Sequence, residues 1–142
     1  MLKGIPALLS PELLKVLAEM GHRDEILIAD RNFPSRSMTE NLIRLDGHGI
    51  PQILEAILKF FPLDESVFPV TLETVLKGED PHIWDEYRQI VQNSDERPKG
   101  ELIQTVNHAE FYEKVSNCYA VIASGEKALY GNIILKKGLV LD

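Results

Sequence analysis

Helical and strand-like stretches alternate along the whole chain. Apolar residues recur at helical spacing in four stretches, which predicts helices at 11–20, 51–60, 81–92 and 108–115. Short apolar runs predict strands at 25–29, 42–45, 67–76, 102–106, 119–123 and 133–135. This alternation is typical of an α/β fold, so we expect a single compact domain over residues 1–142 with a largely parallel central sheet flanked by helices.

Capping and helix-breaking residues mark where these elements begin and end. Ser10 before Pro11 predicts the start of the first helix, and Asn107 predicts the start of the last one. Gly21 is predicted to end the first helix in a left-handed conformation. The polar stretches 31–41 and 93–100 contain Pro and other helix-breaking residues, which predicts loops.

Composition narrows the class of ligand. The chain has 142 residues, of which 44% are hydrophobic, and a formal net charge of −7. A protein this acidic is poorly suited to nonspecific binding of nucleic acid or an anionic membrane, because both need a basic surface. We therefore expect no nucleic-acid or membrane partner, and a ligand that is neutral or cationic rather than phosphorylated.

Cysteine usage and the N-terminal segment bear on the compartment. Cys118 is the only cysteine, so no internal disulfide can form and a cysteine-ligated zinc site is excluded. The stretch 1–9 is too short and too weakly apolar for a signal peptide, and no apolar run has the ~18 residues of a membrane helix. These features predict a cytoplasmic protein.

Ligands of α/β folds bind beyond the carboxyl ends of the strands, which draws attention to Asp30, to Asp46 and to the residues after Val106 and Ala123. Asp30 follows the first predicted strand and could accept hydrogen bonds from a polyol. His108 follows the strand at 102–106 and opens a helix. Each also has a structural interpretation, since Asp30 can stabilise a turn and His108 can be a surface residue of the first helical turn.

His22 is the histidine with the clearest chemical potential. It follows Gly21 at the end of the first predicted helix, where the helix dipole favours the protonated imidazole, and Asp24 lies two residues further on. A partly protonated histidine is suited to general acid catalysis. The alternative is a capping histidine that contacts the last carbonyl groups of the helix.

A third candidate is the segment Tyr130–Gly131–Asn132, directly before the last strand. Tyr130 offers a hydroxyl and a flat apolar face, and Asn132 offers donors and acceptors, which together suit a carbohydrate. An ordinary turn would also use Gly and Asn here. The sequence contains no glycine-rich phosphate loop and no recognisable metal motif.

Several blocks of the sequence, taken together, resemble one family over nearly the whole chain. The blocks are Leu8–Leu14, Met20–Ile26, Ala29–Pro34, Arg44–Gly47, Pro62–Asp64, Phe111–Glu113, Gly125–Glu126, Tyr130–Asn132 and Leu135–Gly138. They are similar to those of the fucose mutarotases, which are related to the ribose pyranases. The stretch 76–100 matches least.

The resemblance implies a function, a site and an assembly. Members of this family interconvert anomers or ring forms of free monosaccharides without a cofactor. The fucose branch forms a ring-based decamer with sugar sites at subunit boundaries. By resemblance, His22 is the catalytic proton donor, and we expect Asp24 to orient or charge it. The expected substrate-binding residues are Asp30, His108, Tyr130, Gly131 and Asn132.

One position departs from the fucose pattern. The fucose enzymes commonly carry Arg where this chain has His108, and the ribose branch carries His there. The longer N-terminal match favours L-fucose as the substrate. Two alternatives remain open, which are a ribose pyranase-like activity on another monosaccharide and a non-catalytic monosaccharide-binding protein.

Overall fold

The computed structural model describes residues 1–65, 68–95, 97 and 101–142. Its helices are α1 (Pro11–Glu19), α2 (Ser35–Met38), α3 (Ile50–Leu58), α4 (Ile83–Ser94) and α5 (His108–Ser116). Its strands are β1 (Glu25–Ala29), β2 (Leu42–Leu45), β3 (Val70–Glu73), β4 (Ile103–Val106), β5 (Ala120–Ser124) and β6 (Ile133–Lys136). The predicted strand at 67–76 is therefore shorter, and its residue 67 lies outside the described residues, as do 96 and 98–100 of the predicted 93–100 loop.

Within the described residues, the strands form one six-stranded sheet in the order β2-β5-β1-β6-β3-β4. β2, β5 and β1 are mutually parallel, and β3 is parallel to β4. β6 runs antiparallel to both of its neighbours, β1 and β3. Five of these six strands therefore share one direction, and the prediction of a largely parallel sheet is confirmed.

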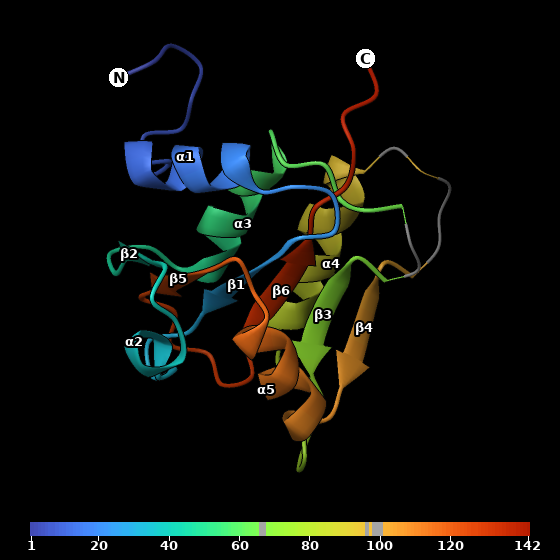
Figure 1. Ribbon diagram of the computed structural model, residues 1–142. Helices are drawn as coiled ribbons and strands as arrows, with labels where there is room; N and C mark the ends of the chain where they lie inside the picture. Colours follow the sequence, from blue (N-terminus) through green and yellow to red (C-terminus); the bar gives the residue numbers. More distant parts are fainter. Residues whose placement is uncertain (66–67, 96, 98–100) are drawn as a thin grey trace.

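Helices cover both faces of this sheet (Figure 1). The larger apolar cluster packs α1, α3 and α4 against one face, through residues such as Leu13, Ile53 and Trp84. The smaller cluster packs Phe111 and Val115 of α5 against the other face. Ile26 and Ile28 belong to the first cluster and Leu27 to the second, because successive side chains of a strand point to opposite faces. β1 is thus buried on both sides, as its continuous apolar run predicts.

The predicted N-caps are confirmed, but two other local predictions are wrong. The Ser10 side chain accepts a hydrogen bond from Leu13 N, and the Asn107 side chain accepts one from Glu110 N. Gly21 does not adopt a left-handed conformation; instead Lys137 Nζ donates to Leu17 O at 2.7 Å and Met20 O at 2.6 Å and so satisfies the end of α1. The predicted 31–41 loop contains the short helix α2.

No described helix combines the length and the apolar character that crossing a bilayer requires.

Gly125 sits where two loops at the carboxyl ends of β2 and β5 come into direct contact. Its backbone N donates to His48 O at 2.8 Å. A Cβ atom at this position would lie 2.2 Å from the backbone oxygen of Asp46, whereas one at Gly47 would meet nothing within 4 Å. Only glycine therefore fits at position 125.

We expect Gly125→Ala to reduce the free energy of unfolding by about 1–3 kcal/mol, because the backbone at Asp46 must move to admit the methyl group. Gly47→Ala is the matched control and should stay within about 0.5 kcal/mol of the wild type. Urea unfolding of the three proteins measures both changes. Equal stability of the two variants would show that the close approach at Gly125 is not a constraint.

Candidate active site

Polar side chains gather where the parallel strands end. Asp30 follows β1, Glu73 ends β3 and His108 follows β4. Because β6 runs the other way, its first residues lie at this same edge, and the backbone N of Asp30 donates to Asn132 Oδ1 at 2.7 Å. The structure therefore brings two of the predicted sugar-binding residues into direct contact. We call this end of the sheet the carboxyl edge.

Asp30 also has the turn-stabilising role that its position suggested. Its Oδ1 accepts a hydrogen bond from the backbone N of Asn32 at 2.9 Å. Together with Ser124 and Arg44, Asp30 lines a cavity of about 180 Å³ at the carboxyl edge. The carboxylate is thus held in a fixed orientation while it borders a cavity.

The segment 130–132 is held from behind by two aromatic residues of α4. Trp84 Nε1 donates to Tyr130 O at 2.9 Å, and the Tyr87 hydroxyl donates to Gly131 O at 2.6 Å. Tyr130 has a left-handed backbone, with φ of 56°. Burial raises the pKa of Tyr87 far above its ordinary value, so this hydroxyl stays protonated and remains a donor. These contacts fix the turn that presents Asn132 to Asp30.

His108 is fixed by contacts from two different elements. Its Nδ1 lies 3.1 Å from Glu73 Oε2, and its ring centroid lies 4.2 Å from that of Tyr112, one turn further along α5. Tyr112 also contacts Phe33. Burial raises the pKa of Tyr112, with further contributions from the negative charges of Glu73 and Asp30. Tyr112 therefore lies in the field of two carboxylates at the carboxyl edge.

His22 lies at the other end of β1, before the strand begins. Its Nε2 is 3.0 Å from Oδ1 of Asp64, whose side chain is only 5% exposed, whereas that of His22 is 39% exposed. Lys137 donates to the carbonyls of Leu17 and Met20 at the end of α1, and the hydrogen bond of the His22 side chain among the described residues is with Asp64, so His22 does not cap this helix. Asp24 accepts a hydrogen bond from the backbone N of Gly21 at 2.7 Å, and its predicted effect on His22 remains a prediction.

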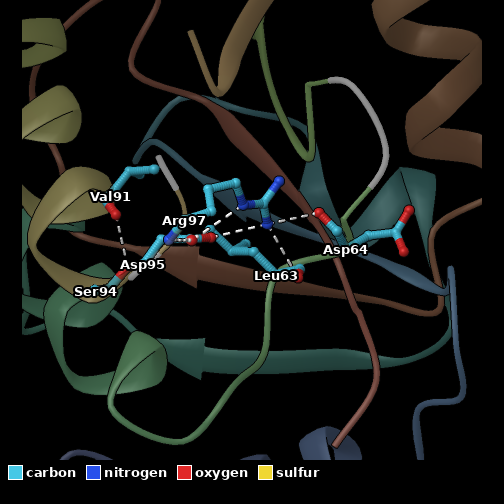
Figure 2. A network of polar contacts seen from close by, with 6 residues as sticks. All are labelled: Leu63, Asp64, Val91, Ser94, Asp95 and Arg97. Carbon is cyan, nitrogen blue, oxygen red and sulfur yellow. Dashed lines mark hydrogen bonds and ion pairs between the residues drawn. The ribbon is translucent and has the colours of Figure 1, made fainter. Parts of the chain in front are cut away.

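The backbone on either side of Asp64 is held by Arg97. The Arg97 guanidinium donates to the carbonyl oxygens of Leu63 and Asp64, at 3.3 and 2.8 Å, and pairs with the carboxylate of Asp95. Figure 2 shows this network. The backbone N of Asp64 donates to Lys136 O at 3.0 Å. The backbone of Asp64 is therefore fixed against β6 independently of the contact between its side chain and His22.

A cavity of about 790 Å³ adjoins His22, and its lining includes Asp64, Arg97 and Leu139. This volume lies within the range of small-molecule sites. The cavity at the carboxyl edge is smaller, at about 180 Å³. Each end of the sheet therefore borders one cavity that charged side chains line.

The two ends cannot meet within one copy of the chain. β1 spans five residues between His22 and Asp30, which at ~3.3 Å per residue separates them by about 15 Å. The predicted site residues therefore fall into two groups. The carboxyl edge carries Asp30, His108, Tyr130, Gly131 and Asn132, and the opposite end, which we call the amino edge, carries His22 and Asp24.

Sequence reasoning assigned no role to Asp64, Glu73, Tyr112 or Arg97. Asp64 and Tyr112 lie in blocks that carried the family resemblance, so their positions were marked although their contacts were not. Asp64 is 42 residues from His22, and Glu73 is 35 residues from His108. Residue spacing cannot reveal partners that only the sheet brings together.

The chain is similar to known proteins over nearly its whole length. Residues 3–140 match the model of the RbsD / FucU transport protein family. The chain belongs to this family. A protein of Homo sapiens named fucose mutarotase is 45% identical over 148 residues, covering 98% of this chain and 94% of that protein. The resemblance to fucose mutarotases is thereby confirmed.

Solved structures agree with this assignment. The fucose mutarotase of Streptococcus pneumoniae in complex with L-fucose is 46% identical, has a TM-score of 0.92, and is matched over 99% of this chain and 100% of that chain. Bacillus subtilis RbsD complexed with D-ribose is 21% identical, has a TM-score of 0.76, and is matched over 99% of this chain and 100% of that one. The second likeness shows the shared fold, and the predicted fold class is confirmed.

We expect Tyr87→Phe to lower the free energy of unfolding by about 1–3 kcal/mol, because the buried carbonyl of Gly131 loses its donor. The same change should raise the KM for sugar, since the 130–132 turn is no longer fixed. Tyr119→Phe is the matched control, because no hydrogen bond of its hydroxyl is present among the described residues. Unfolding and saturation kinetics that leave Tyr87→Phe equal to wild type would contradict this role of α4.

Proposed function

We propose that this protein is an L-fucose mutarotase, which interconverts the α and β anomers of free L-fucopyranose. The observation that carries the proposal is the near-complete match to a fucose mutarotase whose structure contains L-fucose, at 46% identity and a TM-score of 0.92. The relatives from zebrafish, Danio rerio, and from human bear the same name. The two edges carry imidazole and carboxylate groups, which can exchange protons with a sugar and bind its hydroxyl groups.

Mutarotation requires proton transfers together with the reversible cleavage of the ring C–O bond. The anomeric hydroxyl gives its proton to a base, for which Asp30 or His108 is proposed, the ring oxygen gains a proton from an acid, and the ring C–O bond breaks to give the open-chain aldehyde. Rotation about the bond next to the aldehyde and closure on its other face reverse these transfers and give the other anomer. Positioned acid and base groups accelerate such steps by roughly 10²–10⁴-fold, so the proposed chemistry requires no metal or organic cofactor.

His22 is the proposed proton donor. The carboxylate of Asp64 holds its Nε2, which leaves Nδ1 to exchange a proton with the ring oxygen. The imidazole gives its proton to the ring oxygen in the opening step and takes it back in the closing step. Asp24 contributes by holding the turn at Gly21 that carries His22.

The proposed sugar-binding residues are those of the carboxyl edge. Asp30 accepts hydrogen bonds from sugar hydroxyls, Asn132 and the backbone of the 130–131 segment fix their orientation, and Tyr130 offers its ring to an apolar sugar face. His108 binds a further hydroxyl. The negative charge of Asp30 and Glu73 at this edge suits a neutral sugar better than a phosphorylated one.

A complete site then needs two copies of the chain. Because about 15 Å of β1 separates the edges, we propose that the amino edge of one copy meets the carboxyl edge of the next. A contact between two different surfaces is heterologous and closes into a ring when the rotation permits it. The decamer that the resemblance implies is the assembly we propose, acting in the cytoplasm.

Ribose pyranase-like activity is the second candidate, and one residue favours it. His108 stands where the fucose branch commonly has Arg, and an imidazole is shorter than a guanidinium and not permanently charged. The exchange rates with L-fucose and D-ribose under the same conditions separate the two activities. Faster catalysed exchange of D-ribose would assign the protein to the ribose branch.

We expect His22→Ala to slow catalysed anomer exchange of L-fucose by roughly 10²–10⁴-fold, because the ring oxygen loses its proton donor. Saturation-exchange NMR between the two anomeric proton signals measures this rate. Lys15→Ala is the control, since the Lys15 side chain is 77% exposed on α1 and pairs only with Glu19 among the described residues. Unchanged exchange in His22→Ala would exclude the proposed proton donor.

The wild-type spectrum tests the function itself. Binding of L-fucose with exchange at the rate of the sugar alone would instead identify a non-catalytic monosaccharide-binding protein.

A further inference from the structure

Glu73 is an acidic residue in a position that ordinarily favours an apolar one. It ends β3, whose four residues are all buried, and it is only 9% exposed itself. A carboxylate removed from water costs free energy unless hydrogen bonds compensate for the lost hydration. Its hydrogen-bond partner is the imidazole of His108, at 3.1 Å.

The imidazole of His108 is held by three independent features. Asn107 caps α5 and fixes the backbone at the first helical residue. Tyr112 packs against the ring at 4.2 Å with an interplanar angle of 34°. Glu73 Oε2 forms a hydrogen bond with Nδ1, yet the His108 side chain remains 60% exposed. The ring is therefore fixed in orientation while much of it still faces solvent at the carboxyl edge.

The contact with Glu73 decides which nitrogen carries the proton. An ionised carboxylate can only accept hydrogen bonds, so Nδ1 must be the donor. In a neutral imidazole the other nitrogen, Nε2, then carries the lone pair and is an acceptor. Nε2 is the nitrogen that remains for a ligand on the exposed side of the ring.

We propose that Glu73 is a positioning and specificity-determining residue, which keeps the proton of His108 on Nδ1 so that Nε2 accepts a hydrogen bond from a sugar hydroxyl. This inference rests on the proposed function, because it assigns the hydrogen-bonding sense of one sugar contact. An Arg in place of His108 could only donate hydrogen bonds to the sugar. The Glu73–His108 pair therefore fixes the direction of this hydrogen bond, with the sugar hydroxyl as the donor.

The first experiment examines the imidazole without any sugar. Long-range ¹⁵N–¹H NMR of the uniformly labelled protein distinguishes the two neutral tautomers, and loss of the signals in His108→Ala assigns them. We expect the proton of His108 on Nδ1 in the wild type and a shift of the population towards Nε2 in Glu73→Ala. A proton on Nε2 in the wild type, or identical populations in both proteins, would overturn the proposal.

The second experiment asks whether Glu73 acts through His108. Loss of a hydrogen bond to a charged group predicts a rise in the KM for L-fucose of about tenfold in Glu73→Ala, with a smaller change in kcat. In the His108→Ala background, Glu73→Ala should add no further rise, because residues that act on one contact are not additive. Equal effects of Glu73→Ala in both backgrounds would show that its role is only structural.

Two further variants separate this role from a loss of folding. Glu73→Gln keeps an accepting oxygen of the same reach, so it should fold as the wild type does and raise KM less than Glu73→Ala. Glu113→Ala removes an exposed carboxylate from α5 and should leave KM unchanged. If Glu73→Ala does not fold, Glu73→Leu, which has a similar volume but no accepting oxygen, carries both measurements, and an unchanged tautomer population together with an unchanged KM would overturn the proposal.

The tautomer measurement also stands apart from the activity. Wild-type protein that fails to exchange the anomers of L-fucose would contradict the proposed mutarotase function while the proton of His108 could still be found on Nδ1. A proton on Nε2 in an active enzyme would contradict only the role of Glu73.

Discussion

The buried strand β1 is the constraint on which the rest of the structure depends. It is hydrogen-bonded on both sides, parallel to β5 and antiparallel to β6, and residues 26–29 are fully buried. Such a strand can neither bend nor slide, because a shift by one residue would exchange its two apolar faces. His22 and Asp30 are therefore held at opposite edges of the sheet. A chemistry that needs both must be completed by a second copy of the chain.

The two edges share one design. At each, a partly exposed imidazole is held by a buried carboxylate, through His22 and Asp64 at the amino edge and through His108 and Glu73 at the carboxyl edge. The backbone that carries each carboxylate is itself held in place. Arg97 donates to the carbonyl of Asp64, and Glu73 is the last residue of the strand β3. A reaction that moves protons to and from a bound sugar is faster when its acid and base groups are already oriented before the sugar binds.

Sequence patterns predicted much of the local structure and placed part of the proposed site at one edge of the sheet. The capping residues Ser10 and Asn107 determine helix starts by contacts within one turn, so they could be identified without the fold. The position of Asp30 and His108 at one edge followed from the parallel sheet. Asn132 joins them only because β6 runs antiparallel, and an apolar run carries no information about strand direction. The end of α1 was mispredicted because Lys137, which satisfies it, lies 117 residues from Met20.

Complementation between two inactive variants tests the central claim most directly. His22→Ala and Asp30→Asn each damage one edge, so a mixed assembly contains boundaries where an intact amino edge faces an intact carboxyl edge. Co-expressed in equal amounts, the two variants should form such boundaries at about a quarter of the sites and regain that share of wild-type exchange. A mixture as inactive as either variant alone, beside fully active co-expressed wild type, would contradict a site shared between copies.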